Sequence, residues 1–253
     1  MNENPPILSL GDASELAALI RDKVDPALMG LSAGKLTEYL NHVGSSQPRT
    51  PGPDAGRLQR WQDDIIESTV PQGCSILDLG CGHGDLLVRL MDRKQVRGQG
   101  IELDPDAVIQ CVRQGVPVVQ ADLDEGLKDF ADESFDYAVL EQTLQTVRRP
   151  IALLQEMLRV ARRGIVSFPN FAYWRVRLDL GLRGRMPITE RLPYRWYDTP
   201  NIHSFTLQDF EDWTRTCGVR ILSGHVLAEG QVRELRASDN LYAEEVLVFV
   251  ERE

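Results

Sequence analysis

The first residues that could bind a ligand are an acid and three glycines that follow a short apolar run. Asp78 lies at the end of this run, and Gly80, Gly82 and Gly84 occupy alternate positions after it. Glycine has no Cβ, so the backbone there can take a positive φ angle and approach a ligand closely. Residues 86–91 predict a helix, so the turn opens onto a helix N-terminus, where doubly wound sheets commonly hold nucleotides.

The spacing of these glycines indicates which nucleotide to expect. A dinucleotide-binding turn has the pattern G-x-G-x-x-G, whereas this chain has G-x-G-x-G with Asp85 in the place of the last dinucleotide glycine. A pyrophosphate would face the carboxylates of Asp78 and Asp85. S-adenosylmethionine (SAM) carries an ammonium and a sulfonium and no phosphate, so acids favour it. The turn resembles the first motif of class I SAM-dependent methyltransferases, and a plain strand-turn-helix corner is the alternative.

Two further acids end the next two predicted strands. Residues 99–104 predict the second strand, and Glu102 lies about 20 residues beyond the turn, the usual distance for an acid that binds ribose hydroxyls. Leu103 is placed to pack on the adenine. Residues 116–123 predict a third short strand that ends near Asp122. Each acid alone also fits a solvated strand end, so the interpretation depends on both of them following the glycine turn.

Composition bounds the class of protein. A chain of 253 residues suits one α/β domain with an appendage, and a net charge of −10 argues against broad nucleic-acid binding. The four cysteines form no C-x-x-C pair and the four histidines have no metal-ligand spacing. No apolar run approaches the roughly 20 residues that span a bilayer, and Met1 to Pro6 lack the features of a signal peptide. We therefore expect a cytoplasmic chain that binds no metal, membrane or nucleic acid.

The chain is expected to divide near residue 55. Residues 1–55 predict a helical extension followed by a linker rich in proline, glycine and serine, and residues 56–253 predict the ligand-binding domain. Within the extension, Asp12 predicts the start of one helix and residues 33–43 predict another.

One motif in the extension is misleading. Gly30 to Gly34 match G-x-S-x-G, the nucleophile elbow of α/β-hydrolases. That elbow needs a preceding buried strand, whereas the residues before it are charged and include Pro26. We expect Ser32 to act as a helix N-cap without a chemical role.

Apolar runs and helical patterns alternate through the rest of the chain. Short apolar runs predict buried strands, and segments with apolar residues at helical spacing predict the helices between them. Thr206, followed three residues later by Asp209, has the spacing of a capping box. The expected fold is α/β, a doubly wound, seven-stranded, mostly parallel sheet of the Rossmann-like class I methyltransferase type. The predicted strands are residues 76–78, 99–104, 116–123, 135–140, 164–168, 219–227 and 245–250.

Residues 169–205 form an insertion rich in aromatic side chains and arginine. Such residues are enriched at the hot spots of protein interfaces, and bidentate arginines would also suit a lid over a carboxylate substrate. A third alternative is that the aromatics pack on the sheet edge while the arginines stay in solvent. The side chains concerned are Tyr173, Trp174, Tyr194, Trp196, Tyr197, Arg175, Arg177, Arg183, Arg185, Arg191 and Arg195.

Several segments resemble the methionine biosynthesis protein MetW family. They are the glycine turn and residues 115–124, 142–145, 156–160, 165–171 and 199–203. The resemblance implies a methyltransferase-like subunit that acts with homoserine O-acetyltransferase (MetX, an α/β-hydrolase) in methionine synthesis. It also implies SAM or S-adenosylhomocysteine as the ligand, with Glu102 at the ribose and Asp122 at the adenine amine. The residues expected at the ligand are Asp78, Gly80, Cys81, Gly82, Gly84, Glu102, Leu103, Asp122, Leu123 and Glu141.

The sequence leaves open whether the chain is an enzyme. Methyl transfer requires a positioned acceptor and, where needed, a base that removes its proton, and the nearest candidates are Glu141 and His203. The first hypothesis is a SAM-binding subunit that docks on homoserine O-acetyltransferase through residues 170–203 and supports or tunes its activity. The alternative is an autonomous class I methyltransferase that acts on a small molecule. A nicotinamide oxidoreductase is disfavoured by the glycine spacing, and the oligomeric state is left open.

Overall fold

The computed structural model describes residues 32–43 and 60–253 of the chain. The chain divides after Ala55 into two units, which are treated separately. In the first unit, helix α2 (Ala33–Val43) begins after Ser32, whose hydroxyl accepts a hydrogen bond from the Lys35 backbone at 3.4 Å. Ser32 is therefore a helix cap, as expected. The helix predicted from Asp12 and the predicted linker lie outside the described residues.

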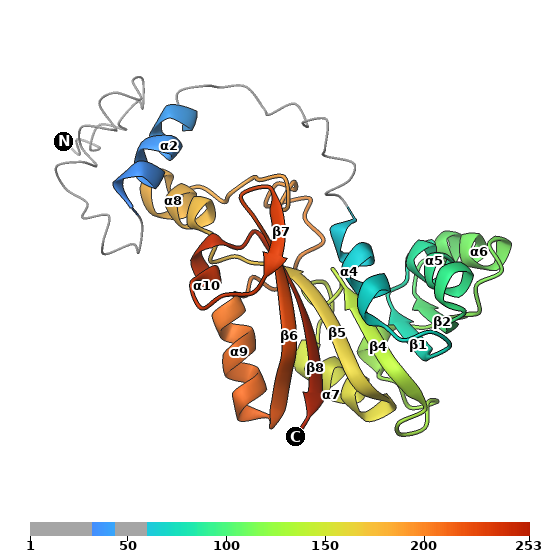
Figure 1. The fold of residues 1–253 in the computed structure, drawn as a ribbon. Helices are drawn as coiled ribbons and strands as arrows, with labels where there is room; N and C mark the ends of the chain where they lie inside the picture. The colour runs from blue at the N-terminus through green and yellow to red at the C-terminus, as the bar shows by residue number, and fades with distance from the viewer. Residues whose placement is uncertain (1–31, 44–59) are drawn as a thin grey trace. The chain divides into compact units, whose positions relative to one another are not determined.

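The second unit is built on one sheet, which the part of the chain described here forms from eight strands in the order β3-β2-β1-β4-β5-β8-β6-β7 (Figure 1). Strands β1 to β5 pair in parallel, and β8 runs antiparallel to both of its neighbours. The predicted fold class is confirmed, with one strand more than the seven expected. The bounds are β1 Ser75–Leu79, β2 Arg97–Glu102, β3 Val118–Gln120, β4 Phe135–Glu141, β5 Ala161–Pro169, β6 Val219–Ala228, β7 Gln231–Glu234 and β8 Glu245–Arg252.

Helices cover both faces of this sheet (Figure 1). The helices described in this unit are α4 Trp61–Thr69, α5 Asp85–Lys94, α6 Pro105–Arg113, α7 Pro150–Val160, α8 Trp174–Arg183, α9 Leu207–Thr216 and α10 Asp239–Tyr242. Neighbouring residues of a strand point to opposite faces, so Leu77 packs in the core under α7 and α9, while Ile76 packs in the core under α4 and α5. Asp78 has the same parity as Ile76 and belongs to the α4 face.

Local hydrogen bonds fix the helix ends that the sequence predicts. The Asp104 carboxylate accepts the Asp106 backbone N–H at 2.9 Å, and Pro105 is the first residue of α6. At α9, the Thr206 hydroxyl accepts the Asp209 N–H while the Asp209 carboxylate accepts the Thr206 N–H. The capping box predicted at Thr206 is confirmed, and Asp104 caps α6.

The sheet topology brings acids from distant parts of the chain to one edge. In a parallel sheet the carboxyl ends of neighbouring strands meet at the same edge. Asp78, Glu102 and Glu141 lie at the ends of β1, β2 and β4. Because β8 is antiparallel, its first residue, Glu245, pairs with Pro169 at the end of β5 and reaches that same edge.

Candidate functional site

The glycine turn after β1 has the backbone that its sequence predicts. Gly80, Gly82 and Gly84 have φ angles of +82°, +53° and +85°. The backbone N–H of Gly80 donates to the Ile101 carbonyl at 2.8 Å, and that of Gly82 donates to Glu102 Oε2 at 2.8 Å. The turn is thus tied to β2 and to the acid that ends it.

Alanine at Gly80 tests how closely the turn is packed. Its Cβ would lie 2.8 Å from Thr143 Oγ1, whereas a Cβ at Gly73, which also has a positive φ, would meet nothing within 4 Å. We expect Gly80→Ala to lower the free energy of unfolding by about 2–4 kcal/mol, combining a left-handed backbone with overpacking. Gly73→Ala, which has only the backbone cost, should lose about 1–2 kcal/mol. Urea denaturation compares the two, and equal losses would contradict close packing at Gly80.

Cys81 packs beneath the turn. Its Sγ lies 3.8 Å from Cys111 Sγ in α6, and the Cys111 thiol donates to the Gly82 carbonyl at 3.2 Å. A Cβ added at Gly100 of β2 would overlap the Cys81 sulfur. The small side chain at position 81 therefore allows the turn to lie directly on β2, and a contact between Cys81 and ligand stays a prediction.

The Glu102 carboxylate accepts hydrogen bonds from the surrounding backbone and still has an acceptor site for a ligand. Its Oε1 accepts the backbone N–H groups of Leu103 and Asp104 at 2.7 and 2.9 Å, and its Oε2 accepts the Gly82 N–H. A carboxylate has about four acceptor sites, so Oε2 can still accept a hydroxyl. Beside it, the Leu103 side chain is 59% exposed, which suits an apolar contact with a base.

Asp122 and Leu123 follow β3, the strand that pairs with β2 and its terminal Glu102. Asp122 Oδ1 accepts the Asp124 backbone N–H at 2.9 Å and caps a short 3-10 turn, Leu123–Glu125. Leu123 is half-buried. Both lie at the carboxyl edge of the sheet, and their contact with adenine stays a prediction.

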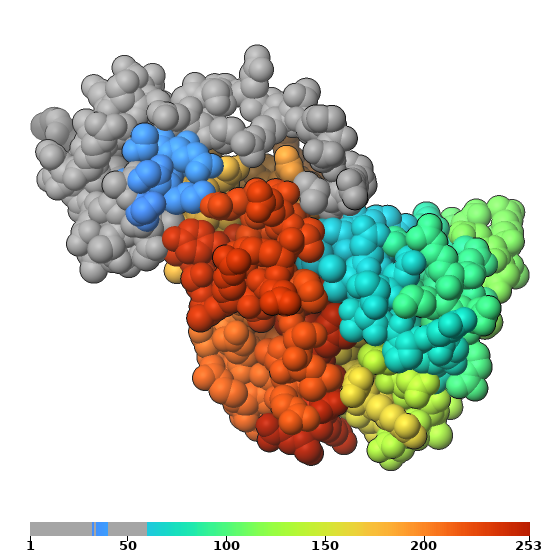
Figure 2. Space-filling view, in the orientation of Figure 1, coloured from blue at the N-terminus to red at the C-terminus, as the bar shows by residue number. Residues whose placement is uncertain are grey.

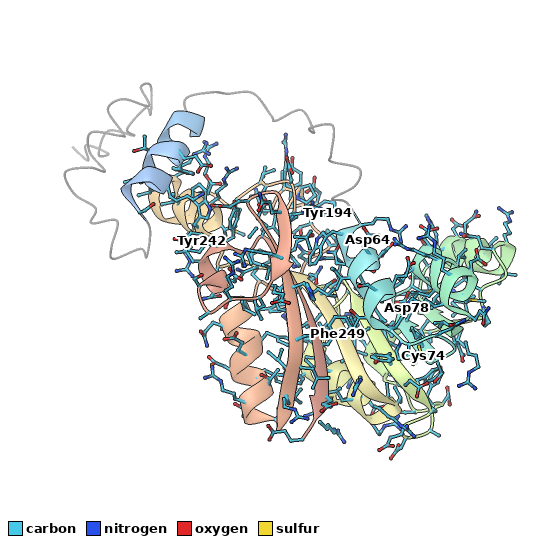
Figure 3. All side chains as sticks on the ribbon, in the orientation of Figure 1. Asp64, Cys74, Asp78, Tyr194, Tyr242 and Phe249 are labelled. Carbon is cyan, nitrogen blue, oxygen red and sulfur yellow. The ribbon has the colours of Figure 1, made fainter. Side chains whose placement is uncertain are left out.

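Asp78 and Glu141 share an environment that disfavours negative charge. Burial, then the neighbouring carboxylates of Asp63 and Glu102, raises the pKa of Asp78 to about 7. Burial, then the carboxylates of Asp63 and Asp78, raises the pKa of Glu141 to about 8. Figure 3 shows Asp78 beside α4, the helix that also carries Asp64.

Helix α4 brings buried polar residues to this edge of the sheet, and the sequence interpretation did not predict them. Asp63 is 2% exposed, and its Oδ2 forms an ion pair with Arg60 Nε at 2.7 Å. Gln62 is equally buried, beside Trp61 on the face that packs against the sheet. Two polar residues on the apolar face of an amphipathic helix were the available signal, because such residues are seldom buried without a specific partner.

Glu245 joins α4 to the loop after β4. Glu245 Oε2 accepts Trp61 Nε1 at 2.8 Å and Gln62 Nε2 at 3.3 Å, and Oε1 accepts Gln142 Nε2 at 3.4 Å. Arg191 Nε lies 3.6 Å from Glu245 Oε2. The side chains of α4 (cyan) and of the C-terminal strands (red) accordingly lie directly against each other in Figure 2.

The two candidate bases lie on segments that contact each other. The backbone N–H of His203 donates to the carbonyl of Gln145 at 3.1 Å, in the loop that follows Glu141. His203 Nε2 is buried and has no hydrogen-bond partner among the described residues. A catalytic role for either residue stays a prediction.

The insertion separates into a packed part and an exposed part. Tyr173 and Trp174, at the start of α8, are 4% and 1% exposed, so these aromatics belong to the core. The later residues differ, with Trp196 75% exposed and Tyr197 61% exposed. We call the exposed part the 186–202 surface; its large apolar side chains are Met186, Ile188, Tyr194, Trp196, Tyr197 and Ile202.

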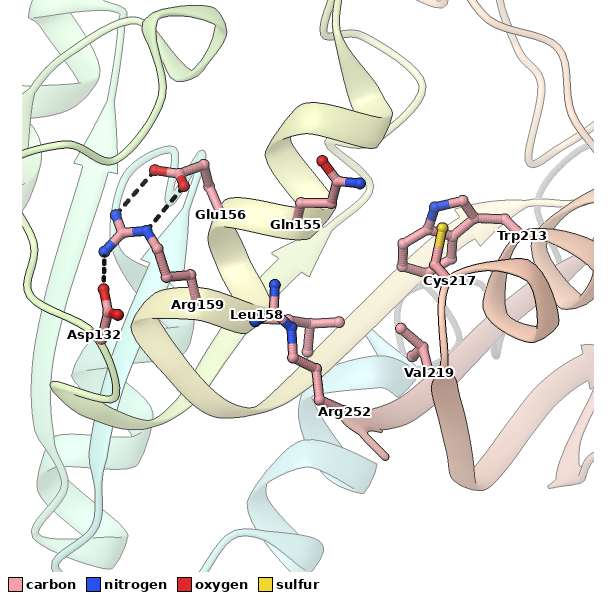
Figure 4. A pocket seen from close by; sticks show the side chains of 9 residues that line it. All are labelled: Asp132, Gln155, Glu156, Leu158, Arg159, Trp213, Cys217, Val219 and Arg252. Atoms are coloured by element: carbon pink, nitrogen blue, oxygen red, sulfur yellow. Dashed lines mark hydrogen bonds and ion pairs between the residues drawn. The ribbon is translucent and has the colours of Figure 1, made fainter.

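A separate pocket of about 470 Å³ lies at the opposite edge of the sheet (Figure 4). It lies where α7 ends before β5 and where β8 ends beside the start of β6, and Arg159, Trp213 and Arg252 line it. Arg159 is bound there to Glu156 and Asp132. Doubly wound folds bind ligands at the carboxyl ends of their strands, so we place the candidate site at the glycine turn and not in this pocket.

The described residues contain neither a metal-ligand cluster nor a membrane-spanning helix. Within residues 32–43 and 60–253, no three His, Cys, Asp or Glu side chains are grouped so that they could hold a metal ion. None of the helices in the same ranges has the length and apolar character needed to cross a membrane.

The sheet order, the glycine turn after β1 and the acid at the end of β2 define the fold of class I SAM-dependent methyltransferases. A SAM-dependent methyltransferase of Thermotoga maritima, a possible histamine N-methyltransferase, superimposes with a TM-score of 0.56 at 18% identity, covering 78% of this chain and 95% of that one. An S-adenosylmethionine-dependent methyltransferase of Mesorhizobium loti gives 0.56 at 19%, covering 75% and 96%. These structures share the fold.

Within this class, the chain belongs to the methionine biosynthesis protein MetW family, whose model matches residues 60–250. The bifunctional methionine biosynthesis protein MetXA/MetW of Rhodopirellula baltica is 35% identical over 204 residues, which cover 76% of this chain and 32% of that protein. The chain therefore spans about a third of the length of this curated relative.

Proposed function

We propose that this chain is a SAM-binding subunit that supports or regulates homoserine O-acetyltransferase in methionine synthesis. The observation that carries the proposal is the 186–202 surface, an exposed run of aromatic and aliphatic side chains on a domain that has a well-formed nucleotide turn. Large exposed apolar patches on a folded domain mark interaction sites.

Three features of the turn fit SAM. A Cβ at Gly82 would meet no atom within 4 Å, so the backbone there faces open space. Glu102 keeps an acceptor site for a ribose hydroxyl, and the exposed Leu103 offers an apolar contact to adenine. Asp78, Gly80, Cys81 and Gly84 would border the ligand, and Asp122 and Leu123 would contact its base. SAM, when bound, supplies an activated methyl group; in this proposal the protein binds and orients it.

Two arguments support the partner. In the Rhodopirellula baltica relative, MetXA and MetW are parts of one protein, which keeps the two activities together. In this chain, Tyr194, Trp196 and Tyr197 stand in a short segment held at its base by the buried Leu192. Tyrosine and tryptophan are the residues most enriched at interface hot spots.

Reconstitution with homoserine O-acetyltransferase tests the proposal. The two proteins would be co-purified, and acetyl transfer to homoserine would be measured with and without this chain and with and without SAM. We expect a complex, a higher rate in the presence of the chain, and a change in rate on adding SAM. The absence of both a complex and a change in rate would refute the partner role.

A second candidate is an autonomous methyltransferase. Glu141 favours it, because a general base is most effective when its pKa lies near the operating pH. Burial raises the pKa of Glu141 to about 8. This candidate requires that SAM be converted to S-adenosylhomocysteine when small metabolites are supplied. Mass spectrometry of the products decides between turnover and simple binding.

A further inference from the structure

The 186–202 surface is attached to the interior of the domain at two points. Before its aromatic residues, the Arg191 side chain is 13% exposed, and its Nε lies 3.6 Å from Glu245 Oε2. After them, the backbone N–H of Ile202 donates to the Gln145 carbonyl at 2.9 Å. The surface is therefore fixed both to the first residue of β8 and to the loop that follows β4.

Glu245 is the point where the first attachment reaches the sheet. Its side chain is buried, and its backbone is paired with β5 on one side and with β6 on the other. Besides Arg191, it binds Trp61 and Gln62 of α4 and Gln142 of the loop after β4. A buried carboxylate needs its partners, because an uncompensated charge in the interior is costly. Glu245 therefore holds three segments in one arrangement.

Gln142 has a backbone conformation that few residues other than glycine adopt. Its φ angle is +51°, in the left-handed region. Its backbone N–H donates to the Ser167 carbonyl at 3.2 Å, and its own carbonyl accepts Gln145 Nε2 at 2.8 Å. Strained backbone persists only where the surrounding structure determines it, and it is found at ligand clamps and switch regions. Gln142 can therefore return to a negative φ when its bonds to Glu245 and to the loop are released.

The same loop contacts the glycine turn. Thr143 follows Gln142, and a Cβ at Gly80 would lie 2.8 Å from Thr143 Oγ1. The Thr143 hydroxyl also donates to the Glu141 carbonyl at 2.9 Å. A change in the backbone of Gln142 would therefore move the side chain that packs against Gly80. These contacts connect the 186–202 surface to the turn.

We propose that Glu245 and Gln142 couple partner binding at the 186–202 surface to nucleoside binding at the glycine turn. Both ligands select the loop conformation in which Gln142 is left-handed and Glu245 is bound to Arg191. Glu245 is a positioning residue, because it acts through these two neighbours. The inference rests on the proposed function. Linkage makes the coupling reciprocal, so the partner tightens nucleoside binding by the factor by which the nucleoside tightens partner binding.

Calorimetry measures this coupling as a ratio of two affinities. S-adenosylhomocysteine is titrated into the chain alone and into the chain saturated with homoserine O-acetyltransferase. We expect the wild type to bind it at least about fivefold more tightly in the complex. In Glu245→Gln this ratio should fall below about twofold, because the amide has no charge to hold Arg191 and has one acceptor oxygen in place of two. A purely structural defect weakens both titrations and leaves their ratio unchanged.

Arg191→Gln is the second variant, since it removes the same ion pair from the other side. It should lose the coupling as Glu245→Gln does. The matched control is Glu251→Gln, near the other end of the same strand, where the carboxylate pairs with Arg163 Nε at 3.3 Å. Glu251→Gln should keep the wild-type ratio.

Three outcomes would contradict the inference. A wild-type ratio in Glu245→Gln or in Arg191→Gln would overturn the route through Glu245. Equal affinities for S-adenosylhomocysteine in the free wild-type chain and in the complex would overturn the coupling and leave the proposed partner role intact. A chain that forms no complex with homoserine O-acetyltransferase would refute the proposed function and the coupling together.

Discussion

Replacing Trp196 with alanine is expected to weaken binding to homoserine O-acetyltransferase by at least about 30-fold, the effect of losing one interface hot spot. Trp196 is 75% exposed, and its ring stands edge-on to Tyr197 with centroids 5.5 Å apart. The Tyr197 hydroxyl accepts Arg195 Nη1 at 2.9 Å. The three neighbours thus present a pre-ordered aromatic and cationic group, which costs little conformational entropy to dock.

The control for this prediction is Val112→Ala, on α6 at the other end of the sheet. Val112 is 64% exposed, so its truncation removes exposed apolar area far along the sheet order from the 186–202 surface. Biolayer interferometry with immobilised partner would measure both affinities. Trp196→Ala should keep its SAM affinity and its thermal stability. Wild-type partner affinity in Trp196→Ala would exclude this surface as the docking site.

Raising the pH from 5 to 8.5 is expected to lower the free energy of unfolding by at least about 2 kcal/mol. Burial raises the pKa of Asp78 to about 7 and the pKa of Glu141 to about 8. A carboxyl group with a raised pKa in the folded state binds its proton more tightly there than in the unfolded chain. Its contribution is therefore present at low pH and is lost as the pH rises through the folded pKa.

The window for this loss runs from about pH 4, near the ordinary carboxyl values, to about pH 8. Charges from several elements set the limits of this pH window. Among the described groups that act on both Asp78 and Glu141, Arg60 is the one that lowers their pKa values. The other groups are Asp63 on α4, Glu102 on β2 and Glu245 on β8. Urea unfolding at pH 5, 6, 7 and 8.5 would measure the slope.

Glu141→Gln provides the discriminating variant for this slope. The amide cannot ionise, so the variant should be more stable than the wild type at pH 8.5 and should depend less on pH. Asp64→Asn, whose carboxylate lies on the exposed face of α4, should keep the wild-type slope. A slope that is the same in Glu141→Gln and in the wild type would show that this carboxyl group does not titrate in the window.

Much of the fold follows from short-range patterns. The capping box of Thr206 and Asp209, and Asp104 with Pro105, join residues within three positions of each other, so the sequence alone predicts them. The strand β7 was missed because Gln231 to Glu234 contain a single apolar residue and depend on pairing with β6. A short polar strand has too little hydrophobic pattern to be recognised.

The sequence predicts only part of the candidate site, and the reason differs from that for β7. Asp78 and Glu102 adjoin a recognisable turn, whereas Asp63 becomes part of the edge only when α4 packs on the sheet near Glu141. Within the insertion, Trp174 and Trp196 have the same residue type and opposite exposure. Tertiary packing decides both the position of Asp63 and the exposure of the two tryptophans. Residue composition alone does not predict either of them.

The position of β8 has a consequence for how the protein is made. Glu245 begins the last strand along the described chain, and that strand inserts between β5 and β6. On the ribosome, α4 and the glycine turn emerge long before the residue that binds Trp61 and Gln62. Domains fold as units once their distant segments are available. Ligand binding by a stalled nascent chain would therefore begin only after β8 has left the exit tunnel.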